Sequence, residues 1–140
     1  MLVLAETWRQ LLHEYAAREE YRYTVDGDSI IIRFKAAGER HIGLKLNATD
    51  SFLVVFMFDE RFVEEDRRPL AVMACNRWNA EKLIPKLYLN EHEDGQCDIV
   101  GEWSVPSCLG ADLSSFTQVM EWAIATLDSV YEWLGENYGL

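Results

Sequence analysis

Cysteine is scarce in this sequence, and its three cysteines are too widely spaced to form a recognisable framework. Cys75, Cys97 and Cys108 are an odd number and contain no C-x-x-C pair. This pattern argues against a disulfide scaffold and against a paired-cysteine zinc site. We expect the cysteines to act mainly as small buried hydrophobic residues, as free cysteines usually do. Cys108, which follows Pro106 and Ser107, is the one expected at the surface.

Motifs that mark catalytic sites are missing as well. The sequence has no G-x-S-x-G, H-E-x-x-H, G-x-x-x-x-G-K-[ST] or G-x-G-x-x-G pattern. Its three histidines, His13, His41 and His92, fall in three different predicted elements. Residues 91–94 combine three carboxylates with His92, but they lack the spacing of a Ca²⁺ loop and are expected to form a solvated turn. We therefore predict no catalytic, cofactor-binding or metal-binding residues, and no cofactor.

Long apolar runs and clusters of basic residues are also absent. The longest apolar run covers residues 52–58, whereas a membrane helix needs about 20. The first residues lack the basic region of a secretion signal. Acidic residues outnumber basic ones by 24 to 13, for a net charge of −11, and such a surface repels phosphate backbones and anionic membranes. We expect a cytoplasmic protein that binds neither nucleic acid nor membrane, while a basic protein partner fits the charge.

What is present is enough apolar material for one packed domain over residues 1–140, since 49% of the residues are hydrophobic. Apolar residues at helical spacing alternate with short β-branched or alternating runs, and these runs are separated by tight turns. The predicted helices cover about residues 4–20, 66–81 and 112–134, and the predicted strands cover residues 21–25, 29–35, 41–47, 52–58, 83–90 and 96–105.

The order of these elements predicts an α+β fold with three helices on an antiparallel sheet of about five strands. It reads α-β-β-β-β-α-β-β-α, or α-β-β-β-α-β-β-α if the first two strands merge into one bent hairpin arm. Short turns between strands favour an antiparallel meander over crossovers. The run at residues 52–58 has no polar side chain, so we expect it in mid-sheet with both faces covered.

The last predicted helix has the clearest pattern. An apolar stripe runs from Phe116 to Leu134, with Glu121, Asp128, Glu132 and Glu136 on the opposite face. Asp112, Ser114 and Ser115 compete as N-caps, and Ser115 with Gln118 makes a possible capping box. At about 100° per residue, Trp122 and Trp133 fall within roughly 20° of each other on a flank of the stripe. We predict that these two tryptophans contact a protein partner or a second copy of the chain.

The stretch at residues 75–89 carries the most specific information. A helix end with Asn76, Trp78 and Asn79 leads into a strand that begins near Pro85, and an acidic-Gly turn and the sequence G-E-W follow. This cassette resembles the YbjN family, a bacterial group whose fold is like that of type III secretion chaperones. The similarity is strongest over residues 74–136, and residues 78–81 and 85–86 are similar to actinobacterial members. The positions that match the family pattern are Asn76, Trp78, Asn79, Pro85, Tyr88, Asp94, Gly95, Glu102, Trp133 and Leu134.

The resemblance implies a type III secretion chaperone-like fold and no enzyme activity, because the family has no established active-site motif. The residues themselves favour structural roles. Asn79 suits a helix end, where its amide can bond free backbone groups, and Trp78 is suited to anchoring the middle helix on the sheet.

Three interpretations of function remain open at this point. The first is a non-enzymatic, chaperone-like module that binds a segment of a partner protein. The second is a structural or regulatory homodimer without a stable client, and the third is a small-molecule-binding domain or enzyme with no recognisable motif. An apolar surplus favours a homodimer in any case, because three helices do not obviously cover both faces of the sheet.

Overall fold

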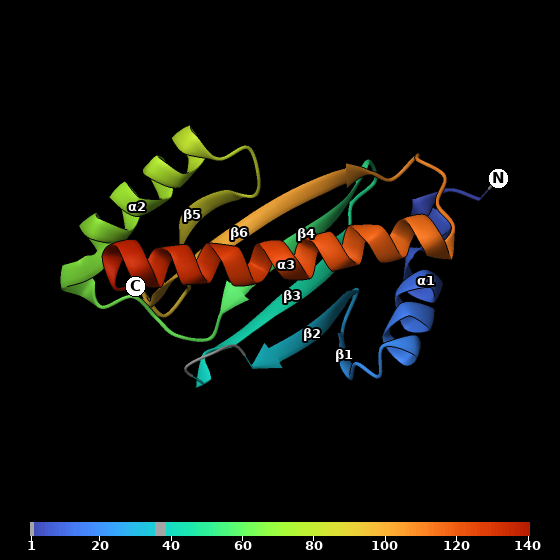
Figure 1. Ribbon diagram of the computed structural model, residues 1–140, viewed down its shortest axis with the longest axis horizontal. Helices are drawn as coiled ribbons and strands as arrows, with labels where there is room; N and C mark the ends of the chain where they lie inside the picture. Colours follow the sequence, from blue (N-terminus) through green and yellow to red (C-terminus); the bar gives the residue numbers. More distant parts are fainter. Residues whose placement is uncertain (1, 36–38) are drawn as a thin grey trace.

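The computed structural model describes residues 2–35 and 39–140, and it confirms the α+β class (Figure 1). The helices and strands, in chain order, are α1 (Leu4–Arg18), β1 (Tyr23–Asp26), β2 (Ser29–Lys35), β3 (His41–Ala48), β4 (Phe52–Asp59), α2 (Arg68–Glu81), β5 (Lys86–Glu91), β6 (Cys97–Pro106) and α3 (Leu113–Tyr138). A one-turn 3-10 helix, Glu65–Arg67, precedes α2. No helix among these described residues is both long enough and apolar enough to cross a bilayer.

The strands form one antiparallel sheet in the order β1-β2-β3-β4-β6-β5. The sheet has six strands where about five were predicted, because β1 and β2 remain separate strands. Gly27, with a φ of 58°, makes the tight turn between them, a conformation that glycine adopts without strain. β6 inserts between β4 and β5, and this places β4 near the middle of the sheet as expected.

All three helices cover the same face of the sheet (Figure 1). α3 lies across the sheet, with α1 at one end and α2 at the other. On β4, Leu53, Val55 and Met57 point to the helices and are fully buried. Its other face, with Phe52, Val54, Phe56 and Phe58, is left partly or largely exposed. We predicted that both faces of this strand would be covered. The helices cover one face, and no described residue of this chain forms a layer over the other.

α3 packs by the predicted stripe. Its buried residues are Phe116, Thr117, Met120, Ala123, Leu127, Val130, Tyr131 and Leu134. The N-cap is Asp112, whose Oδ1 accepts a hydrogen bond from the Ser115 N–H at 2.8 Å, while the Asp112 N–H donates to Ser115 Oγ at 3.1 Å. The capping box predicted for Ser115 and Gln118 is wrong, because Ser115 is the third helical residue and not the cap.

Polar side chains tie the C-terminal half of α3 to the rest of the domain. The buried Tyr131 hydroxyl lies 2.8 Å from the Ile99 carbonyl and 3.1 Å from that of Met57, so it bridges β6 and β4. Burial is also the main cause that raises the pKa of Tyr131 well above its usual value. Arg40 donates to the Tyr131 carbonyl at 2.7 Å and to the carboxylate of Asp59 at 2.7 Å. Arg67, ahead of α2, donates to the carbonyls of Tyr138 and Gly139.

Leu127→Asp is expected to unfold the domain. Leu127 is 1% exposed within the packed stripe of α3, so the variant places an unpaired carboxylate in the core. We expect a loss of roughly 4 kcal/mol or more, a large part of the free energy of unfolding of a domain of this size. Urea or thermal unfolding followed by circular dichroism measures it. Ala125→Asp, on the exposed side of the same helix, is the matched control, and an unchanged transition for Leu127→Asp would refute the packing of α3.

Candidate functional site

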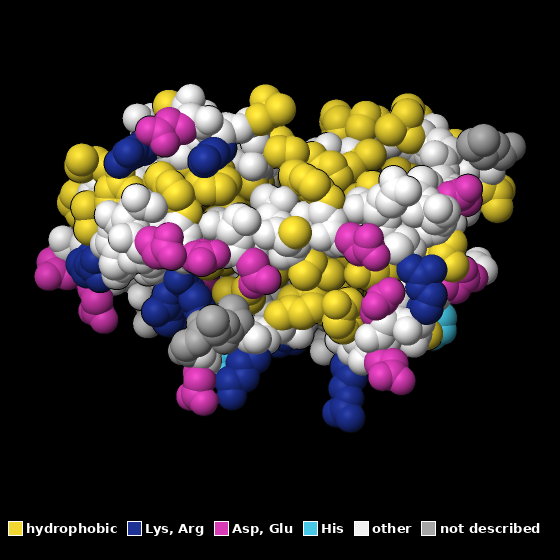
Figure 2. Space-filling model, viewed as in Figure 1, with side chains coloured by type: hydrophobic (Ala, Val, Ile, Leu, Met, Phe, Trp, Pro, Cys, Tyr) yellow, Lys and Arg dark blue, Asp and Glu magenta, His cyan; other side chains and the backbone are white. Residues whose placement is uncertain are grey.

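A groove runs along α3 on the helix side of the domain, beside the loop that joins α2 to β5. Its volume is about 420 Å³. We call it the tryptophan groove, and it is lined by Trp78, Lys82, Leu83 and Ile84 on one side and by Trp122, Thr126, Ser129 and Trp133 on the other. The two tryptophans predicted to contact a partner thus lie in the wall of one groove. Figure 2 shows hydrophobic surface in this region, above the line of α3.

The aromatic walls of the groove are fixed by their own packing. The centroid of the Trp133 ring lies 5.3 Å from that of Trp78 and 5.5 Å from that of Tyr138. The ring centroids of Trp122 and Trp103 are 4.8 Å apart. Trp122 and Trp133 are nevertheless only partly buried. They therefore stabilise the domain and also offer apolar surface to an incoming side chain. Such rings lose little conformational freedom on binding because the domain already holds them.

Leu83 is the most exposed large hydrophobic residue at this groove. It is 93% exposed, in the turn between α2 and β5. Exposed leucines are individually ordinary, but this one stands beside two half-buried tryptophans and thereby extends an apolar patch. No periodic pattern in the sequence pointed to Leu83, because it lies in a turn and not in a helix or strand.

The exposed side of α3, next to the groove, is acidic. The carboxylates of α3 belong to Glu121, Asp128, Glu132 and Glu136, all exposed, and the helix contains neither lysine nor arginine. In Figure 2 a row of acidic side chains follows α3 across the middle of the view. On the opposite wall Lys82 lies 6.0 Å from the centre of the Trp78 ring. The lining of the groove therefore has Lys82 as its charged residue, and the acidic row belongs to the outer side of α3, with Asp128 and Glu132 in the wall of another hollow between α3 and β2–β3.

The family-pattern residues Trp78 and Asn79 hold α2 against the free edge of β5. The Trp78 indole donates to the Pro85 carbonyl at 2.8 Å. The Asn79 side chain accepts from the Leu87 N–H at 2.9 Å and donates to the Leu87 carbonyl at 3.0 Å. Its amide thus replaces the neighbouring strand that an edge strand lacks, and an edge protected in this way does not pair with another chain at that point.

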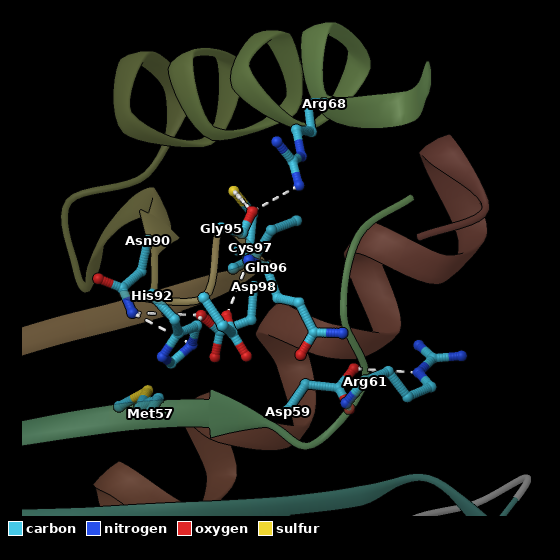
Figure 3. Close-up of polar contacts among 12 residues, drawn as sticks. Met57, Asp59, Arg61, Arg68, Asn90, His92, Gly95, Gln96, Cys97 and Asp98 are labelled. Atoms are coloured by element: carbon cyan, nitrogen blue, oxygen red, sulfur yellow. Dashed lines mark hydrogen bonds and ion pairs between the residues drawn. The ribbon is translucent and has the colours of Figure 1, made fainter. Parts of the chain in front are cut away.

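The other family-pattern residues are dispersed. Asn76 is exposed on α2. Gly95 has a φ of 85° in the β5–β6 turn, and its carbonyl accepts from Arg68 at 2.7 Å (Figure 3). The Tyr88 hydroxyl donates to the carboxylate of Glu102 at 3.1 Å. Burial is the main cause, and the negative charge of Glu102 the second, that raises the pKa of Tyr88 to about 12. Glu102 also pairs with a lysine of β5, at 2.7 Å. Tyr88 and Glu102 lie on the face of the sheet opposite the helices, far from the tryptophan groove.

That opposite face holds a polar cluster that the sequence interpretation missed. The buried carboxylate of Asp98 lies 2.9 Å from His92 Nε2 and 3.3 Å from the Asn90 amide (Figure 3). The signal was present, because Asn90 and Asp98 are opposite each other in the predicted hairpin. Beside this cluster is a shallow depression of about 500 Å³, and its apolar lining comes from Ile31, Phe56, Phe58, Phe62, Tyr88 and Val100.

The cysteines of the domain differ in their exposure to solvent. Cys75 and Cys97 are buried and Cys108 is exposed, and burial raises the pKa of the Cys75 thiol to about 11. Within residues 2–35 and 39–140, no group of three histidine, cysteine or acidic side chains converges to hold a metal ion. The geometry that stands out is instead that of two surfaces able to contact another molecule.

Asn79→Ala is expected to destabilise the domain by about 1–3 kcal/mol, because it leaves the Leu87 N–H and carbonyl without their partner. Asn79→Asp should be no better, since a carboxylate accepts from the N–H but cannot donate to the carbonyl. Asn76→Ala is the matched control, on the exposed side of the same helix, and should change the free energy of unfolding by less than about 0.5 kcal/mol. Urea unfolding measures all three, and equal effects of the two alanine variants would contradict this role of Asn79.

Comparison with known proteins supports the fold and the family resemblance of residues 75–89. A family model described as "YbjN: Putative bacterial sensory transduction regulator" matches residues 9–136. The crystal structure of "YbjN, a putative transcription regulator from E. coli" is similar, with a TM-score of 0.68 and 12% sequence identity over 87% of this chain and 87% of that chain. At this identity the structural similarity shows the fold alone. No curated protein matches the sequence. Because the family model covers most of the chain, this protein belongs to the YbjN family.

Proposed function

We propose that this chain is a non-enzymatic regulatory module that binds a basic, amphipathic segment of another protein in the tryptophan groove. The observation that carries the proposal is the apolar patch of Leu83, Trp122 and Trp133 beside a helix with four carboxylates and no cation. The description of the family as a sensory transduction regulator agrees with a module that acts through a partner.

The chemistry of the groove defines the segment that fits it. Its apolar floor accepts leucine, methionine or aromatic side chains, which are the usual anchors of helix-in-groove recognition. Lysine or arginine on the outer flank of such a segment would be attracted by the exposed carboxylates that run along the neighbouring side of α3. Buried anchors supply most of the affinity in interfaces of this kind, whereas exposed charges mainly raise the association rate and restrict the choice of partner.

The net charge of −11 supports the same class of partner. This charge opposes binding to nucleic acid and to anionic membranes, and it attracts a basic protein segment. The depression beside Asp98 keeps a small ligand as the alternative, since its volume and apolar lining are within the range of ligand sites.

Two synthetic amphipathic peptides of identical apolar sequence test the proposal, one with lysine and one with glutamate at its polar positions. We expect the lysine peptide to bind and the glutamate peptide to bind at least about tenfold more weakly, with a difference that shrinks as salt is raised. Tryptophan fluorescence gives the affinity, because Trp122 and Trp133 line the site.

The matched variants are Leu83→Ser, at the groove, and Leu109→Ser, an exposed leucine next to α1. We expect Leu83→Ser to weaken the lysine peptide about tenfold and Leu109→Ser to leave it unchanged. Folded Trp122→Ala or Trp133→Ala variants should also weaken it. Equal binding of the two peptides, or equal effects of the two serine variants, would exclude the groove as the site. Capture from the native host with wild type and Leu83→Ser then identifies the natural partner.

A further inference from the structure

The face of the sheet that the helices leave uncovered, called the open face below, has an apolar centre. Phe52, Val54, Phe56 and Phe58 of β4 point outward there without a polar residue among them, and Phe52 is 45% exposed. A sheet face in contact with water normally carries polar residues at such positions. The Phe58 ring occupies the space that a Cβ at Gly43 would take. The ring therefore lies flat over Gly43 and does not project far from the sheet.

The two sides of this apolar centre differ in charge. On β2 and β3 the outward charged side chains are Arg33, Lys35 and Lys45, and no carboxylate points outward from these strands. On β6 they are Asp98 and Glu102. Lys45 has no ion-pair partner among the residues that the structure describes. Arg33 pairs with Glu60, Lys35 with Glu39, and Glu102 with Lys86 of β5. The strands therefore place basic side chains on the β2–β3 side of β4 and carboxylates on its β6 side.

The strand register makes this charge distribution self-complementary. Lys45 and Glu102 are both paired with Phe56, one on each side of it, in a single row across the sheet. A twofold axis that runs along β4, in the plane of the open face, exchanges the two sides. A second copy placed by this axis brings its Glu102 over Lys45 and its Lys45 over Glu102, and the two Phe56 rings meet. We infer that the open face is the interface of a homodimer with this symmetry.

The dimensions agree with a stable interface. Six strands about 4.8 Å apart and roughly seven residues long, at about 3.3 Å per residue, give a face of about 650 Å² per copy, or about 1,300 Å² in total. Stable interfaces bury about 1,200–2,000 Å². Packed sheets lie about 10 Å apart and within about 30° of parallel, a gap that lysine and glutamate side chains can bridge together.

A second copy accounts for the open face better than a small ligand does. A ligand in the depression beside Asp98 would cover one end of the apolar centre, whereas the exposed Phe52 lies at the other end of β4. The inference is independent of the proposed function, because the tryptophan groove lies on the helix side and stays open in such a dimer.

Charge reversal at the two predicted contacts tests the arrangement. In sedimentation velocity between 1 and 100 μM at physiological salt, wild type is expected at twice the 16.2 kDa mass of one chain. Lys45→Glu and Glu102→Lys each place like charges opposite each other at both symmetric contacts, so each should weaken the dimer more than tenfold. An equimolar mixture of the two variants restores opposite charges at both contacts and should dimerise again, which an affinity tag on one variant reveals by co-purification.

Glu121→Lys, a charge reversal on exposed α3, is the control and should remain dimeric. Circular dichroism of each variant establishes that it is folded. Monomeric wild type over the whole concentration range overturns the inference. So does a dimer that persists in both single variants, or a mixture of folded variants that stays monomeric. The lysine peptide should still bind to Lys45→Glu, whereas Leu83→Ser should still dimerise, so failure of one proposal does not imply failure of the other.

Discussion

The apolar character of β4 on both of its faces is the constraint on which the rest of this structure depends. Strands of an antiparallel sheet with one wet face alternate between apolar and polar residues, and β4 does not. Its inner face forms the centre of the core with Leu53, Val55 and Met57, and α1 and α3 pack against it, whereas α2 packs on β5 and β6. Its outer face receives no helix, so the sheet that organises the fold also leaves a large apolar surface in contact with solvent.

The junction between α2 and β5 determines the shape of the other candidate surface. The Asn79 side chain bonds the backbone of Leu87 in β5, and the Trp78 indole bonds the carbonyl of Pro85, the residue before β5. These bonds fix the end of α2 over the edge of the sheet. The turn that follows α2 then carries Leu83 beside the tryptophans of α3. Residues of the family cassette thus act as structural residues, and the groove is a consequence of the geometry that they impose.

Much of this fold was predictable from the sequence, because its helices and strands have strong and distinct periodicities. The flank position of Trp122 and Trp133 followed from helical spacing alone. The capping box was misassigned, since Asp112, Ser114 and Ser115 all have suitable side chains and only the entry angle of the chain selects among them. Leu83 was not found, because the exposure of a residue in a turn has no periodic pattern. The Asp98 cluster was missed although the predicted hairpin already places Asn90 opposite Asp98, because the position of His92 depends on how the hairpin tip folds. Which face of the sheet stays uncovered also depends on where helices distant in sequence pack.

Two arginines from other segments, Arg40 and Arg67, bond the C-terminal part of α3 and the residue after it. This end of the helix carries Glu136 and no basic residue, an unfavourable arrangement for the helix dipole. Its last carbonyls are instead bonded by Arg67, which precedes α2, and the carbonyl of Tyr131 by Arg40, which precedes β3. The end of α3 therefore cannot fray without releasing contacts made by two other segments. Amide hydrogens of α3 should exchange together with those of its neighbours, as one cooperative unit, and not by local opening of the terminus.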